Sequence, residues 1–241
     1  MKTRFFISGL FIIACFNMLF AQKPTLQDHL KWGITKMQQE QYRDAIDEFT
    51  KAIDLDAKSA EAYSLRGEVY GKQQNYVQAF ADFDWALTLE PDRAATYFLR
   101  GMLRYDRNEM NMAIEDFTRV VQLDTTNKNA YFYRAKAHIF LNNYTDAIAD
   151  YAKVIAIDAY YADVFYLQAQ VKTLAKDEKG ALADLTEAIR QQPTMAKYYK
   201  ERGFVYTLIQ DYQKARADFD KAVELDPTLM EEIDTIKDLF L

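Results

Sequence analysis

The chain has 241 residues, half of them hydrophobic, so it is long enough to bury a substantial core. Its 30 lysines and arginines are outnumbered by 36 aspartates and glutamates, which gives a net charge of −6. An acidic chain without a basic stretch argues against nucleic acids and anionic membrane surfaces as partners.

The first 21 residues predict an export signal. Lys2 and Arg4 precede an apolar run, 5–20, that ends at Ala21. A basic start, a short apolar middle and a small residue at the end are typical of a signal peptide, and the run is shorter than the roughly 20 residues that span a bilayer. We therefore expect cleavage after Ala21 and a mature protein, 22–241, in the periplasm or outside the cell.

Two other interpretations of this segment stay open. Residues 12–15 resemble a bacterial lipoprotein box, in which Cys15 would carry a lipid and attach the protein to the outer membrane, although the residues after Cys15 stay apolar. The segment could also be an uncleaved anchor. Without a lipid on Cys15 we expect no direct membrane binding after cleavage. Because Cys15 is the only cysteine, the mature chain has no disulfide.

A period of 34 residues runs through the rest of the chain. Alanine recurs at 45, 79, 113, 147, 181 and 215. An aromatic residue or leucine follows four positions later, as Phe49, Phe83, Phe117, Tyr151, Leu185 and Phe219. A small residue stands twelve positions earlier, as Gly33, Gly67, Gly101, Ala135, Ala169 and Gly203. Similarity at one fixed period predicts stacked units of the same structure.

Each period predicts two antiparallel helices. Ala79, Phe83 and Ala86 fall on one helical face. Gly67 and Ala79 let the two backbones approach, so that Phe83 fills the remaining gap. The predicted units are 26–59, 60–93, 94–127, 128–161, 162–195 and 196–229, within one all-α domain, 22–241.

Helix ends are also marked in the sequence. Thr25 and Asp28 predict a cap for the first helix, and four residues are expected to cap second helices: Asn75, Asn143, Asp177 and Asp211. A last helix, 230–241, is expected to cover the end of the stack with an apolar stripe, and Thr228 with Glu231 forms a capping-box pattern. The stripe consists of Met230, Ile233, Ile236 and Phe240.

The repeated 34-residue pattern resembles that of the tetratricopeptide repeat family. Pro91, Pro193 and Pro227 match its closing proline, whereas Ala57, Thr125 and Ala159 depart from it. The resemblance implies a right-handed α-α superhelix whose first helices line a concave groove that binds a protein or peptide. The fifth unit departs most, with Glu178 in the turn, Leu185 for the aromatic residue and Gly180 early in its second helix, so we expect it to be the softest.

A ladder of opposite charges accompanies the repeat. Arginines 66, 100, 134 and 202 stand 16 residues before aspartates 82, 116, 150 and 218. In a hairpin that turns near Gln74, Arg66 and Asp82 lie at one level, so we expect each arginine to pair with an aspartate. Gln168 replaces the arginine opposite Asp184, where the ladder should break.

No constellation of catalytic residues is visible. His29 and His138, the only histidines, lie far apart and are expected to be packed. Carboxylates two residues apart, such as Asp82 and Asp84, point to different faces of a helix. We therefore expect no enzyme activity, no cofactor and no metal.

The expected partner is a protein or peptide in the middle of the groove. The predicted contact residues are Phe98, Met102, Tyr105, Phe132, Lys136, Ile139, Tyr166 and Gln170. The rings at 98, 132 and 166 are expected to form one aromatic strip; alternatively, they only pack against neighbouring helices. Leu30 and Ile34 stand where family members that grip carboxylate-ended tails have lysine and asparagine, so an apolar or aromatic peptide is favoured.

The resemblance to the tetratricopeptide repeat family implies a protein–protein interaction scaffold, and the signal segment predicts that it is exported. The alternative is an accessory or assembly subunit of a cell-envelope complex.

Overall fold

The computed structural model describes residues 23–240, and side chains up to residue 236. The predicted export signal and Cys15 therefore lie outside the described residues, as does the side chain of Phe240. Residues 23–240 form thirteen α-helices and one short 3₁₀ turn, without a strand. None of these helices combines the length and the apolar character that crossing a membrane requires.

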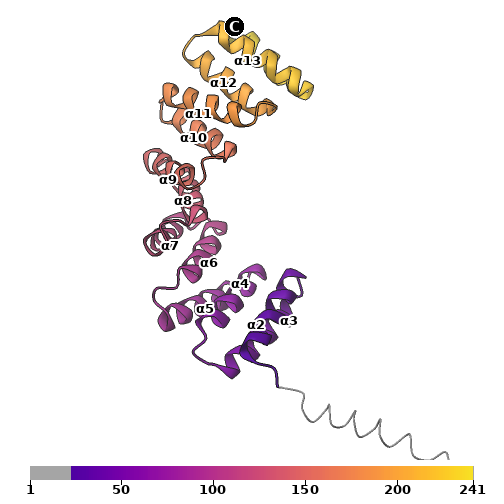
Figure 1. Ribbon diagram of the computed structural model, residues 1–241, viewed down its shortest axis with the longest axis vertical. Helices are drawn as coiled ribbons and strands as arrows, with labels where there is room; N and C mark the ends of the chain where they lie inside the picture. Colours follow the sequence, from indigo (N-terminus) through magenta and orange to yellow (C-terminus); the bar gives the residue numbers. More distant parts are fainter. Residues whose placement is uncertain (1–22, 241) are drawn as a thin grey trace, which may run out of the picture. The chain divides into compact units, whose positions relative to one another are not determined.

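The helices follow one another in pairs, which confirms the predicted all-α repeat (Figure 1). First helices begin at residues 26, 60, 94, 128, 162 and 196, the first residue of each predicted unit. The chain divides into two compact units, the first up to Pro91 and the second from Asp92 onward. Whether they form the single domain expected from the sequence stays a prediction.

Unit 1 contains two helix pairs. They are α2 (Leu26–Gln38) with α3 (Tyr42–Leu55) and α4 (Ala60–Lys72) with α5 (Tyr76–Leu89). Unit 2 contains four pairs and the terminal helix. They are α6 (Ala94–Asp106) with α7 (Met110–Leu123), α8 (Lys128–Phe140) with α9 (Tyr144–Ile157), α10 (Ala162–Leu174) with α11 (Glu178–Gln191), α12 (Ala196–Leu208) with α13 (Tyr212–Leu225), then η1 (Pro227–Leu229) and α14 (Met230–Phe240).

All six pairs turn in the same way. One residue in each turn has a positive φ, between 58° and 63°: Glu40, Gln74, Asn108, Asn142, Lys176 and Gln210. In the turn of α4/α5, the N–H of Asn75 donates to the carbonyl of Tyr70, and the N–H of Gln74 donates to that of Gly71. These two bonds form a Schellman motif, which satisfies carbonyls at the helix end. The predicted turn near Gln74 is confirmed, and none of the six positions carries the glycine that usually relieves this conformation.

Part of the core lies between the two helices of each pair, and it continues between successive pairs. All six period alanines are fully buried, and so are the aromatic residues or leucine four positions later. A Cβ added to Gly101 would lie 2.9 Å from the ring of Phe117, and one added to Gly203 would lie 2.8 Å from the ring of Phe219. The small residue of the first helix therefore leaves the space that the ring of the second helix occupies.

The predicted caps form in part. Thr25 and Asp28 make the expected capping box at α2. Asp177 and Asp211 each accept a backbone N–H at the start of the next helix, from Gly180 and Lys214. The prediction was wrong for the two asparagines.

Asn75 and Asn143 make no side-chain bond to their helices. Asn75 has nearly the same φ and ψ as Asp211, so the backbone does not explain the difference. The aspartates have a physical advantage, because a carboxylate accepts a backbone N–H more strongly than a neutral amide does.

The terminal helix covers the last pair with a narrower stripe than expected. Ile233 is fully buried beside Phe219, and Ile236 packs against the same cluster. Met230, however, is 52% exposed, because it stands at the junction of the 3₁₀ turn and α14. The predicted capping box of Thr228 with Glu231 was wrong as well, since Thr228 donates its backbone N–H and its hydroxyl to Asp226.

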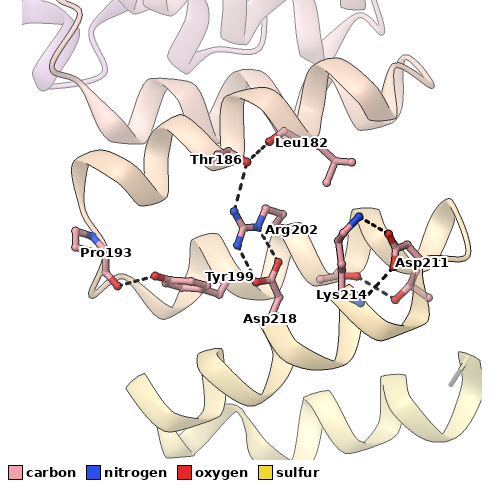
Figure 2. Close-up of polar contacts among 10 residues, drawn as sticks. Leu182, Thr186, Pro193, Tyr199, Arg202, Asp211, Lys214 and Asp218 are labelled. Atoms are coloured by element: carbon pink, nitrogen blue, oxygen red, sulfur yellow. Dashed lines mark hydrogen bonds and ion pairs between the residues drawn. The ribbon is translucent and has the colours of Figure 1, made fainter.

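The charge ladder is confirmed. Figure 2 shows Arg202 donating through Nε and Nη2 to the two carboxylate oxygens of Asp218, at 2.7 and 2.8 Å, while Nη1 reaches the hydroxyl of Thr186 in the preceding pair. Arg66 with Thr50 and Arg134 with Thr118 repeat this bridge between pairs. These three arginines thus join their own pairs to the preceding ones, which helps to set the stacking register.

In two helix pairs, the acidic residue at the equivalent position has a partner other than arginine. In α10/α11, where the sequence predicted a break, the ammonium of Lys172 lies 2.6 Å from Asp184, and Gln168 donates to the carbonyl of Ile148 instead. In α2/α3, Nδ1 of His29 lies 2.6 Å from Glu48, which occupies the aspartate position. His29 is therefore packed, as expected, but in a polar contact that the sequence did not suggest.

Candidate binding groove

The predicted contact residues lie on one set of elements in unit 2. Phe98, Met102 and Tyr105 belong to α6; Phe132, Lys136 and Ile139 to α8; and Tyr166 and Gln170 to α10. All eight side chains are partly exposed. The face they share is called the groove below.

Two of the three predicted rings meet through a ring that the sequence analysis missed. Tyr133 of α8 has its centroid 6.1 Å from that of Phe98 and 5.6 Å from that of Phe132. Phe98 also contacts Phe117, and Phe132 contacts Tyr151, both in the buried core. These rings therefore contribute to packing as well as to the groove.

Tyr166 belongs to a second cluster. Its ring lies 5.4 Å from that of Tyr198, and Lys197 lies over both rings. The prediction of one continuous strip was therefore wrong. Leu167 stands where Tyr133 stands one repeat earlier, so no ring connects Phe132 to Tyr166.

Lys136 projects among the rings of the first cluster. Its ammonium nitrogen lies 5.3 Å from the ring centre of Tyr105, 5.6 Å from that of Tyr133 and 5.9 Å from that of Phe132. A cation at this distance from aromatic faces is attracted by their quadrupoles. Lys136 is thus a partly exposed positive charge held in place by three rings.

A pocket of about 350 Å³ opens further along the groove. Its apolar walls come from α8, α9, α10 and α12: Ile139, Tyr151, Leu167, Val171, Leu174 and Phe204. Gln170, Thr173 and Glu201 add polar atoms. A concave apolar pocket with a few convergent polar groups is the usual form of a binding site.

Glu201 is the charged group of this pocket. The side-chain amide of Gln170 lies 3.3 Å from one of its carboxylate oxygens and 2.9 Å from the hydroxyl of Tyr166. Burial raises the pKa of Glu201, and the bond from Gln170 and the charge of Lys200 offset this only in part. Glu201 was not among the predicted contact residues, although a comparison of equivalent repeat positions could have found it.

Three exposed apolar residues, called the rim below, end first helices that contribute to the pocket, and one of them, Leu174, lines it. Phe140, Leu174 and Leu208 end α8, α10 and α12 at equivalent positions, and they are 59%, 57% and 48% exposed. Large apolar side chains that gather on an exposed surface often mark a site of interaction.

In other helix pairs, several positions equivalent to those of the predicted contact residues are buried. In unit 1, Ser64 is buried and donates its hydroxyl to the carbonyl of Ala60. Leu30 is buried in the core of α2/α3. In unit 2, Thr207 is buried, whereas Phe204 lines the pocket.

Comparisons with known proteins agree with this fold. Family models described as TPR repeat and tetratricopeptide repeat match residues 35–74, 94–127, 129–161 and 196–229. No curated protein matches the sequence significantly.

Several solved structures are similar. The C-terminal part of a TPR repeat-containing protein from Cytophaga hutchinsonii has a TM-score of 0.75 and 20% identity, covering 92% of each chain. YrrB, described as a TPR protein with an unusual peptide-binding site, has a TM-score of 0.70 and 19% identity, covering 78% of this chain and 97% of its own. A MamA protein has a TM-score of 0.66 and 23% identity, covering 73% and 96%. At identities this low, the likenesses show the fold and nothing further.

Proposed function

Because this chain belongs to the tetratricopeptide repeat family, we propose that it is an exported scaffold that binds a peptide or an extended protein segment in the groove of unit 2. The observation that carries this proposal is the pocket formed by α8, α9, α10 and α12, together with the exposed apolar rim residues Phe140, Leu174 and Leu208 at the ends of α8, α10 and α12. Export, and with it a location in the periplasm or outside the cell, is proposed from the sequence of residues 1–21.

The groove suits an extended segment. Its rim repeats along three successive first helices, so a chain lying across them meets one apolar side chain per helix pair. Lys136 offers a positive charge at one place and Glu201 a negative charge at another. Apolar anchors supply most of the energy in such contacts, and charges add orientation.

A double variant of the rim tests this function. Phe140→Ser with Leu208→Ser removes two exposed apolar side chains, so the folded state should be nearly as stable as before. The matched control is Met112→Ser with Ile157→Ser, two exposed apolar residues on second helices of unit 2. The measurement is affinity capture from a cell-envelope extract, followed by mass spectrometry.

We expect the rim variant to lose the captured partner and the control variant to retain it. Equal capture by both variants would contradict binding in the groove. If both variants also remained in one large, stable assembly, the alternative role as an accessory subunit of an envelope complex would be favoured.

A further inference from the structure

We propose that the pocket beside Glu201 receives a lysine or arginine side chain of the bound segment, with the apolar part of that side chain on Leu167, Val171 and Phe204 and its charge at the Glu201 carboxylate. This inference rests on the proposed peptide-binding function and specifies the chemistry of the partner. The bound segment should therefore contain a lysine or arginine next to apolar residues.

The shape of the pocket favours a long, flexible cation. The walls are apolar, whereas the charged oxygen atoms belong to one residue, Glu201. Lysine and arginine have this combination, because they place an apolar stem along apolar surface and carry the charge at the tip. An acidic side chain would meet the carboxylate at close range, and a purely apolar one would leave that carboxylate buried without a cation.

Five cations on the helices that line this site are already engaged elsewhere. On α12, Lys197 lies 2.6 Å from Asp163, Lys200 lies 3.0 Å from Glu232, and Arg202 lies 2.7 Å from Asp218. On α10, Lys172 lies 2.6 Å from Asp184. On α8, the ammonium of Lys136 lies among three rings.

Among residues 23–236, whose side chains the structure describes, no lysine or arginine forms an ion pair with Glu201, and its side-chain contact is the amide of Gln170. Its environment disfavours the negative charge, since burial raises the pKa of this carboxyl. The Glu201 carboxylate is therefore unfavourable in the free protein, and it lines a pocket. A ligand that interacts with the charge would compensate for the cost of burying it. A bound cation is that ligand.

The repeat itself provides an internal comparison. The five positions equivalent to Glu201 are Lys31, Leu65, Leu99, Tyr133 and Leu167. None of them is acidic, so stacking of the helix pairs does not require a carboxylate there. Charge complementarity at this one pair therefore points to the partner and not to the packing of the repeat.

A selection from a random peptide library with blocked ends tests the proposal, and Glu201→Gln is the decisive variant. Glutamine keeps the shape and removes the charge. The matched control is Glu224→Gln, which removes one exposed carboxylate from the second helix α13. Affinities of the selected peptides for the three proteins are measured by calorimetry, together with thermal unfolding at neutral pH.

We expect the wild-type protein to select peptides with a lysine or arginine next to apolar residues. Glu201→Gln should weaken their binding by at least about 10-fold, and Glu224→Gln should leave it unchanged. Binding to the wild-type protein should also weaken as the pH falls through the raised pKa of Glu201, and this pH dependence should disappear in Glu201→Gln. The melting temperature of Glu201→Gln should not fall, because a carboxylate that burial disfavours is removed.

Selected peptides without a basic residue, or equal binding by Glu201→Gln, would overturn this inference and leave the peptide-binding function standing. Failure of the wild-type protein to select any peptide would count against both. Selected basic peptides whose binding is lost in the rim variant would support both.

Discussion

The pairs α8/α9 and α10/α11 bury an aspartate at the same repeat position but satisfy it differently. In α8/α9, Arg134 donates two hydrogen bonds, of 2.8 and 2.6 Å, to the two oxygens of Asp150. In α10/α11, a single ammonium, that of Lys172, lies 2.6 Å from Asp184. Lys172 comes one helical turn later than the arginine position, on the same side of the helix.

This difference shows which feature of the repeat is fixed and which is exchangeable. A buried carboxylate needs a cation, but the cation can come from either of two neighbouring turns. The α6/α7 pair uses both turns, since Arg100 and Arg104 each donate to Asp116. Lys172 compensates only part of the cost of burying Asp184, because burial still raises the pKa of this carboxyl. The arginine also bridges to the preceding pair, through Thr118 in the case of Arg134.

The largest effect is expected from breaking the arginine pair. Asp150→Asn removes the charge that balances Arg134 in a buried position, so the free energy of unfolding should fall by about 3–5 kcal/mol. Asp146→Asn, an exposed change on the same helix, should shift it by less than about 0.5 kcal/mol. Urea titration followed by circular dichroism measures both. Equal stability of the two variants would mean that the ladder does not hold the stack.

A comparable loss is expected in the core of the fifth pair. Leu185 is fully buried where other pairs have an aromatic ring. Leu185→Ala should lower the free energy of unfolding by about 2–5 kcal/mol, through lost burial and a cavity. In a stack of helix pairs, a weakened pair unfolds locally before its neighbours do. Hydrogen exchange should then show amides of α11 exchanging before those of α9; uniform exchange would contradict a softer fifth pair.

A smaller effect separates the helix caps of the same two pairs. Asp177 accepts the N–H of Gly180, whereas Asn143 makes no side-chain bond to α9. Asp177→Ala should therefore cost about 1 kcal/mol, and Asn143→Ala should cost less. Thermal unfolding of the two variants side by side measures the difference. A larger loss for Asn143→Ala would show that its cap bond does form in solution.

The smallest change restores the arginine of the ladder in the fifth pair. Gln168→Arg gives Asp184 a second cation, which should lower the raised pKa of its carboxyl and alter the free energy of unfolding by about 1 kcal/mol or less. Carbon-detected NMR titration of the carboxyl measures this pKa. If the pKa stays the same, the new guanidinium has not reached Asp184.

The sign of the accompanying pH effect follows from the raised pKa. The folded protein binds the proton of Asp184 more tightly than the unfolded chain does. The free energy of unfolding should therefore fall as the pH rises from the pKa that Asp184 has in the unfolded chain to its raised pKa in the folded protein. Gln168→Arg should flatten that decline, and denaturation at several mildly acidic pH values checks it.

The period of the sequence was sufficient to determine the helix pairs. Small residues and rings recur every 34 positions, and the two helices of each pair are neighbours in the chain. The packing within a pair can therefore be inferred from the sequence of one repeat. The start of every first helix and the four Arg–Asp pairs followed from this register. Periodicity could predict them because each contact lies within a single unit.

The groove depended on contacts between successive helix pairs of unit 2, where equivalent positions carry different side chains. Leu167 in place of Tyr133 divided the expected strip into two clusters, and Lys172 replaced the missing arginine of the fifth pair. The pocket combines side chains of α8, α9, α10 and α12, so its volume and the burial of Glu201 arise only when three helix pairs stack. Desolvation of a charge depends on everything packed around it, and this is why the sequence could mark Glu201 as an unusual residue but only the tertiary structure revealed its desolvation.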